Sequence, residues 1–142
     1  MKEEFVTYEI AVKLKEKGFD CNEPFAMYNE LGVFHKLYSS ADFTVSYDAS
    51  FRDYYDYDDF DDHDTVAPTI SQVLLWLREE KKIYVVPTPY PSMSTIDKVI
   101  WSCLIKHKSD GAFMEVPFMP ETYMHYKDAA IEGIEYVIDN LI

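Results

Sequence analysis

The sequence is poor in the residues that build several common kinds of protein. Only four glycines occur in 142 residues, and neither a Walker loop nor a G-x-G-x-x-G pattern is present, so a phosphate-cradling loop is not expected. The two cysteines, Cys21 and Cys103, form no C-x-x-C pair, which argues for a reducing compartment rather than a disulfide framework. No apolar run approaches the roughly 20 residues that span a bilayer, and the N-terminus has no signal-peptide pattern. We expect a cytoplasmic protein that contacts no membrane.

Basic residues are scarce as well. Thirteen Lys and Arg stand against 26 Asp and Glu, which gives a net charge of −13. A chain so negative is repelled by phosphate backbones and by anionic lipid, so direct binding to nucleic acid is not expected. No G-x-S-x-G or H-E-x-x-H motif occurs, and a Cys103–His107 pair would place its thiol on an apolar strand face, where cysteines are usually inert. We predict no catalytic residues, metal ligands or cofactor and lean against an enzyme.

Apolar residues, by contrast, are abundant enough for an ordinary core. They make up 48% of the chain, and aromatic residues alone make up 16%. A chain of this length buries about two thirds of its surface on folding without staples. We therefore expect a single domain over residues 1–142, in which residues 48–64 form an acidic, aromatic-rich loop insertion.

Three stretches have helical patterns. Thr7 is a suitable N-cap and Gly18 a suitable C′ residue for a helix ending at Lys17. Pro68 fits the first position of a second helix, whose apolar residues begin at Ile70. The last helix, from about Tyr126 to the C-terminus, has the clearest helical spacing of apolar residues.

Other stretches alternate apolar and polar residues, as half-buried strands do. The predicted strands are residues 24–28 and 33–38, which form a hairpin around Gly32, then 43–47, 83–86, 98–106 and 112–116. The strand from Ile83 is expected to stop near Pro87, since proline cannot donate to a ladder. This order of elements predicts an α+β fold, a two-layer sandwich of a largely antiparallel sheet with about three helices packed on one face.

Three blocks of the sequence carry a resemblance. These are FVTYEIAVKLKEKGFD near the N-terminus, APTISQVLLWLREEKKIYV in the middle and YKDAAIEGIEYVIDNLI at the end. They resemble a group of small uncharacterised proteins of gut anaerobic bacteria and their phages. That group implies no catalytic residues that could be transferred to this chain. The acidic segment is longer and more acidic here than the resemblance implies.

Residues 48–64, DASFRDYYDYDDFDDHD, are the most unusual stretch. Eight aspartates and one arginine give this segment a charge of −7, which is more than half of the net −13. Charge blocks of this kind are commonly solvated and without a task. Five aromatic residues count against pure solvation. The predicted binding residues are Asp53, Tyr54, Tyr55, Asp56, Tyr57, Asp58, Asp59, Asp61 and Asp62.

Several readings of this segment stay open. An EF-hand register starting at Asp56 fails, because Phe60 stands at a ligand position and Asp61 where glycine is needed. The alternatives are a calcium site of another type and a zinc site that uses His63. As a nucleic-acid mimic the extended segment is dilute, with one charge per roughly 7 Å against one per about 1.7 Å in duplex DNA.

The function favoured by the sequence is that of a small acidic binding or accessory protein. Its Asp/Tyr-rich loop would contact a basic protein partner, because charge speeds encounter and tyrosines supply interface area. The alternatives are a nucleic-acid mimic of phage or mobile-element type, or a metal-dependent enzyme with a site that the sequence does not reveal.

Overall fold

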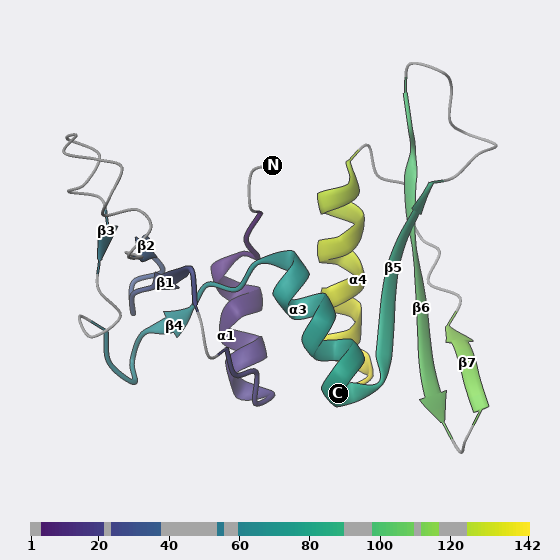
Figure 1. Cartoon of the computed structure of the whole chain (residues 1–142), viewed down its shortest axis with the longest axis horizontal. Coiled ribbons are helices and arrows are strands. Elements are labelled where there is room, and N and C mark those ends of the chain that lie inside the picture. The colour runs from purple at the N-terminus through teal and green to yellow at the C-terminus, as the bar shows by residue number, and fades with distance from the viewer. Residues whose placement is uncertain are drawn as a thin grey trace. The chain divides into compact units, whose positions relative to one another are not determined.

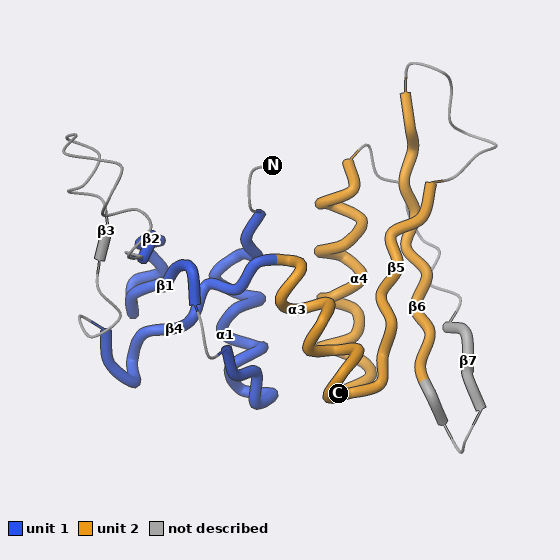
Figure 2. The backbone as a smooth tube through the Cα atoms, viewed as in Figure 1, with its two compact units in different colours: residues 1–69 blue, residues 70–142 orange. Residues whose placement is uncertain are grey.

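The computed structural model describes residues 4–21, 24–37, 54–55, 60–89, 98–109, 112–116 and 125–142, with only the backbone described at 54–55, 108–109 and 112–116. The chain forms two compact units, residues 1–69 and residues 70–142 (Figure 2). Each unit has its own sheet. Whether the whole chain acts as the single domain expected from its length stays a prediction.

Unit 1 begins with helix α1, Tyr8–Glu16. The Thr7 Oγ1 atom accepts a hydrogen bond from the Ile10 N–H at 3.4 Å, as an N-cap should. At the other end Gly18 has φ +84°, a conformation that glycine adopts without steric cost. Both helix ends were predicted correctly. The buried face of α1 consists of Ile10, Ala11 and Leu14.

The sheet of unit 1 has the strand order β3-β2-β1-β4. Its members are β1 (Ala26–Tyr28), β2 (Phe34–Leu37), β3 (Tyr54–Tyr55) and β4 (Thr65–Val66). Strands β1 and β2 form the predicted hairpin, whose turn is held by the Asn29 Oδ1 atom, which accepts from the Leu31 and Val33 N–H groups. Gly32 has φ +79° and packs against the Tyr8 ring.

The core of unit 1 includes one buried polar contact. The Tyr28 hydroxyl donates to the Val6 carbonyl at 2.6 Å. Burial, with a smaller contribution from the Glu9 carboxylate, raises the pKa of Tyr28. The hydroxyl therefore stays protonated and remains a donor at neutral pH.

Unit 2 begins with a helix that changes its winding. Helix α3, Ile70–Trp76, continues into a π-helical turn, η3, Leu77–Lys81. It ends at Lys82, which has φ +57° and whose N–H donates to the Leu77 carbonyl. The predicted start at Pro68 was two residues early, because Pro68 belongs to unit 1 and its carbonyl accepts from the Val6 N–H of the same unit.

The sheet of unit 2 has the order β5-β6-β7 and is antiparallel throughout. Its strands are β5 (Ile83–Pro89), β6 (Trp101–Ser109) and β7 (Ala112–Val116). Helix α4, Tyr126–Asn140, packs on β5 and β6, with α3 beside it (Figure 1). Its buried face consists of Ala129, Ala130, Gly133, Ile134, Val137 and Ile138.

The α+β class is confirmed, and the sheets are largely antiparallel, with the β2–β3 pair parallel. Three details differ from the prediction. The strand predicted at 98–106 begins and ends later, as β6, Trp101–Ser109. The described strands are divided between two sheets instead of one. Strand β5 continues through Pro87 to Pro89, which an edge strand tolerates because one side of its backbone needs no ladder partner. The predicted strand at 43–47 lies outside the described residues.

Candidate functional site

The predicted binding residues fall into three groups in the structure. Asp53, Asp56, Tyr57, Asp58 and Asp59 lie outside the described residues. Tyr54 and Tyr55 form strand β3. Asp61 and Asp62 belong to a turn that leads into β4, and both are exposed. The described part of the acidic segment is therefore attached to unit 1 on both sides of residues 56–59.

Strand β3 lies at the edge of the sheet of unit 1. It runs parallel to β2, with Tyr54 opposite Lys36 and Tyr55 opposite Leu37. A parallel neighbour needs a long connection from the preceding strand, and residues 38–53 supply the chain for it. The acidic segment thus contributes a strand to the folded unit.

The turn before β4 is built from the aspartates themselves. The Asp61 carboxylate accepts from the His63 N–H at 2.8 Å, and the Asp64 carboxylate accepts from the Asp61 N–H at 2.9 Å. The Asp64 N–H also donates to the Asp61 carbonyl at 3.1 Å. Such side-chain bonds to nearby backbone are typical of Asp in turns. They fix the backbone and leave the Asp62 carboxylate without a hydrogen-bond partner among the described residues.

Lys15 of α1 connects this turn to the helix. Its ammonium group donates to the carbonyl of Asp62 at 2.6 Å and to that of Asp64 at 2.8 Å. The contact joins residues 47 and 49 positions apart in the chain. Two backbone carbonyl oxygens of this turn therefore hold the Lys15 ammonium group.

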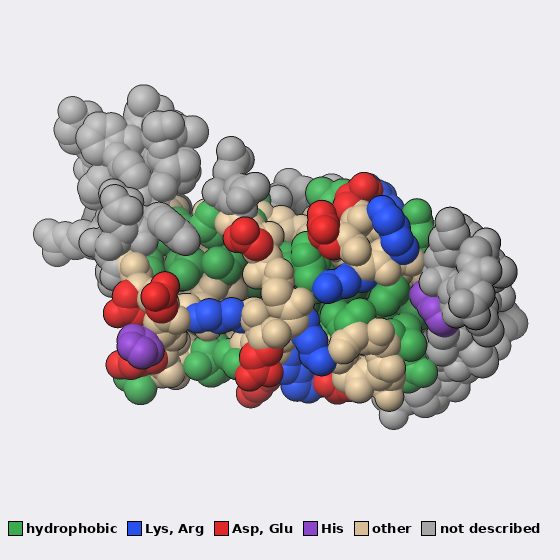
Figure 3. Space-filling view, turned by 90° about the horizontal axis from the view of Figure 1, so that it is seen from below, with side chains coloured by type: hydrophobic (Ala, Val, Ile, Leu, Met, Phe, Trp, Pro, Cys, Tyr) green, Lys and Arg blue, Asp and Glu red, His purple; other side chains and the backbone are tan. Residues whose placement is uncertain are grey.

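A hollow of about 330 Å³ lies beside this contact. Its floor is apolar, with Ala11, Phe19 and Met27, and its rim carries Lys15 and the three aspartates of the turn. Figure 3 shows acidic side chains around a histidine, next to a basic side chain, over the left end of unit 1.

A second contact fixes the beginning of the turn. The Phe60 ring lies 5.8 Å from the His35 ring of β2, measured between centroids. The His35 Nε2 atom lies 3.4 Å from the Asn29 side-chain nitrogen. Sequence reasoning missed both Lys15 and His35, because nothing in their local sequence marks them as neighbours of the acidic segment.

Two features of the described residues concern metal binding and cysteine chemistry. No group of three or more His, Cys, Asp or Glu that could hold a metal ion occurs among them. Cys103 is buried, and burial raises the pKa of its thiol to about 12, although a hydrogen bond with the Val86 backbone opposes the shift. A thiol with so high a pKa is a poor nucleophile at neutral pH, as expected for its strand position.

Comparison with models of protein families, with curated proteins and with solved structures found no match to this chain. In the parts of the chain that the structure describes, no helix has the length and apolarity to cross a bilayer.

Proposed function

We propose that this protein is a small acidic binding or accessory protein, and that residues 48–64 contact a partner with a basic surface. The observation that carries the proposal is the pair of hydrogen bonds from the Lys15 ammonium to the Asp62 and Asp64 carbonyls. The acidic turn already holds one cationic side chain of the protein itself. The Asp61 and Asp62 carboxylates beside it are exposed.

Electrostatics supports an association that is steered by charge. The 1–69 unit has 16 acidic and 6 basic residues, a net charge of −10, whereas the 70–142 unit has 10 and 7, a net charge of −3. An acidic surface on one unit raises the local concentration of cationic partners and speeds encounter by roughly 10-fold to 1,000-fold. Attachment of the segment at β3 and at the Lys15 contact lowers the entropy lost when a partner binds.

The test uses two variants of equal charge. In the first, Asp56, Asp58, Asp59, Asp61 and Asp62 are changed to Asn. In the control, five exposed acids elsewhere, Glu4, Glu16, Asp20, Glu30 and Asp128, are changed to the corresponding amides. Wild-type protein captures partners from a bacterial lysate, and surface plasmon resonance then measures association rates with the recovered partner at several salt concentrations.

We expect association to slow by roughly tenfold in the first variant and by less than about twofold in the control, because steering depends on where the charge lies. The rate with wild-type protein should fall as salt is added, since the Debye length shrinks from about 10 Å at 0.1 M to about 3 Å at 1 M. Equal slowing in both variants would leave only net charge as the cause, and unchanged rates in the first variant would refute the proposal.

A further inference from the structure

A groove in unit 2 lies between α3 and the edge strand β5. Its volume is about 360 Å³, and its apolar lining includes Leu74 and Leu75 of the helix and Val86 of the strand. Leu75 is 50% exposed and Val86 is 42% exposed. Apolar side chains left half open on both sides of a groove are typical of a surface that receives another apolar side chain.

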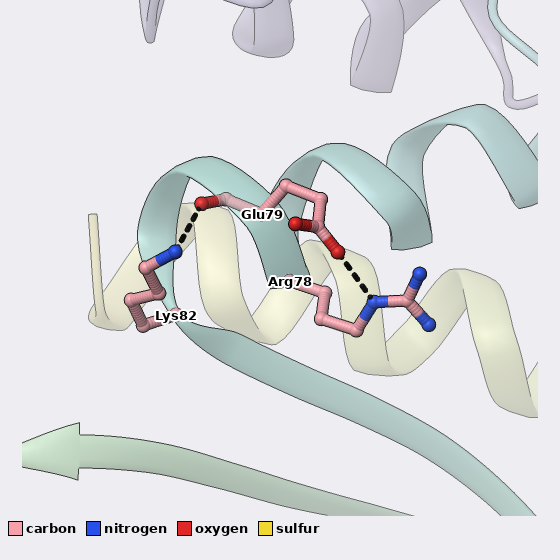
Figure 4. Close-up of polar contacts among 3 residues, drawn as sticks. All are labelled: Arg78, Glu79 and Lys82. Atoms are coloured by element: carbon pink, nitrogen blue, oxygen red, sulfur yellow. Dashed lines mark hydrogen bonds and ion pairs between the residues drawn. The ribbon is translucent and has the colours of Figure 1, made fainter.

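Arg78 supplies the charge at this groove. It lines the groove one helical turn after Leu74, and its Nε atom donates to the Glu79 carboxylate at 3.0 Å. The two terminal nitrogens point away from Glu79 and have no partner among the described residues (Figure 4). A guanidinium group has five N–H donors, so four remain for a carboxylate, which arginine binds bidentately.

The spacing of these groups indicates what they fit. Leu74 and Arg78 are four residues apart, a rise of about 6 Å at the 1.5 Å per residue of an α-helix. In an extended peptide, side chains two residues apart point the same way and lie roughly 6.6 Å apart. An extended segment with a large apolar residue and an aspartate two positions later therefore matches an apolar groove with a guanidinium at its end.

The acidic segment of this chain contains that pattern four times in succession. Residues 51–62 read FRD-YYD-YDD-FDD, four triplets that each begin with an aromatic residue and end with aspartate. The third triplet, Tyr57-Asp58-Asp59, lies in the sequence between the two parts of the segment that are attached to unit 1, namely β3 and the turn from Phe60.

We propose that the groove between α3 and β5 binds an aromatic-x-Asp triplet from the acidic segment of a second copy of this chain. This proposal rests on the proposed function, since it names one cationic group, Arg78, that the acidic segment recognises. The aromatic ring fills the space between Leu75 and Val86, and the aspartate pairs with the terminal nitrogens of Arg78. Because the segment belongs to one unit and the groove to the other, the contact between two copies uses a different surface of each copy and is heterologous.

The net charge of −13 opposes this association and predicts an unusual dependence on salt. Repulsion between two acidic chains acts over long distances, whereas the Arg78 contact is short and partly desolvated. Raising the salt from 0.01 M to 0.15 M shortens the Debye length from about 30 Å to about 8 Å, which removes most of the repulsion but little of the direct contact. Association should therefore tighten over this range.

Two measurements test the proposal with the full chain. The first is fluorescence anisotropy of a labelled peptide with the sequence of residues 51–62, together with a control peptide in which the four triplet-ending aspartates are changed to Asn. The second is sedimentation velocity of the unlabelled protein over a range of concentrations. Both use wild-type protein, Arg78→Gln, and the charge-matched control Lys81→Gln, because Lys81 lies over the Trp76 ring and does not line the groove.

We expect the peptide of residues 51–62 to bind wild-type protein saturably. Its affinity should fall about tenfold with the Arg78→Gln protein, and the Asn peptide should bind wild-type protein about tenfold more weakly, because each change removes a bidentate charged contact. Lys81→Gln should change the affinity less than about twofold. Sedimentation should show oligomers whose share rises with protein concentration and that Arg78→Gln abolishes. Equal effects of the two substitutions, or equal binding of the Asn peptide, would overturn the recognition of the aspartate. If the protein remains monomeric up to about 1 mM, a second copy of the chain is not the occupant of the groove. Arg78→Gln leaves the acidic segment intact, so it should not alter association with a basic partner, and failure here is distinguishable from failure of the proposed function.

Discussion

The contact of α4 with the sheet of unit 2 yields the most quantitative prediction. Gly133 is buried on the face of α4 that packs on β5 and β6. A Cβ atom added there would lie 2.4 Å from the Cys103 Sγ atom and 2.6 Å from the Val85 Cγ1 atom. Ordinary contacts begin near 3.4 Å, so Gly133→Ala forces the helix and the strands apart by up to about 1 Å or makes the two side chains change rotamer.

Two opposing terms set the expected effect of Gly133→Ala on the free energy of unfolding. Alanine is favoured over glycine within a helix by about 1 kcal/mol. Overpacking a close-fitting core costs about 1–3 kcal/mol, and the upper end applies because Val85 is β-branched and stiff. The difference is a destabilisation of about 2 kcal/mol, which corresponds to a fall in Tm of roughly 8 °C for a chain of this size.

The assay is urea unfolding followed by circular dichroism, with a double-mutant cycle as control. Changing Cys103 to Ala removes the Sγ atom but leaves its Cβ, which is 3.7 Å from the added atom and therefore in ordinary contact. Gly133→Ala should cost about 1 kcal/mol less in the Cys103→Ala background than in wild type. If Gly133→Ala were as stable as wild type or more stable, the close approach of α4 to the sheet would be refuted.

Three further predictions concern other parts of the chain. Lys82 has φ +57°, so Lys82→Gly should be more stable than Lys82→Val by about 1–2 kcal/mol in urea unfolding, and equal stability would show that this conformation is not kept. Lys15→Gln removes the two hydrogen bonds to the turn and should speed amide hydrogen exchange in residues 61–66 with little change in Tm; unchanged exchange would contradict the contact. The pKa of the Cys103 thiol rises from 9.0 to about 12 on folding, so the unfolded chain loses this proton first and the free energy of unfolding should fall as pH rises from about 9 towards 12. Cys103→Ala should lack that part of the pH dependence, and at pH 8 a thiol reagent should modify Cys21 well before Cys103; equal rates would show that Cys103 is accessible.

Local patterns predicted the elements whose ends are marked by single residues. Thr7 and Gly18 bound α1 because a cap and a positive φ are properties of a few neighbouring residues. The same holds for the turn at Gly32 and for the helical spacing of α4. Each of these signals is local in the sequence and does not depend on the rest of the fold.

The division into two sheets could not be predicted in this way. Strand alternation shows that a segment is half-buried, but it does not show which other strand it pairs with. Strand β5 illustrates the difference, because Pro87 ends a central strand but not an edge strand, and only the sheet order β5-β6-β7 shows that β5 is at an edge. The two-residue strand β3 is shorter than any period that alternation can reveal.

The residues of the candidate site were predicted, but the contacts that attach the segment to unit 1 were not. The aspartates and tyrosines of residues 48–64 stood out because charge and aromatic content are counts along the chain. The contacts that attach the segment to unit 1, from Lys15 and from His35, join residues distant in the sequence. A lysine in the exposed last turn of a helix is ordinarily solvated, so nothing in the sequence distinguishes Lys15 from its neighbours.

The charged run Arg78-Glu79-Glu80-Lys81-Lys82 shows how geometry assigns different roles to similar residues. As a sequence it is the solvated end of a helix. In the structure the winding changes to a π turn at Leu77, and the cations separate. Lys81 lies 5.1 Å from the Trp76 ring centroid, and Lys82 closes the turn by donating to the Glu79 carbonyl at 2.7 Å. Arg78 lines the groove and uses only its Nε atom within the turn. Arg78 is therefore the cation of this run that lines the groove, and a test that removes it while keeping Lys81 and Lys82 separates binding from the stability of the helix end.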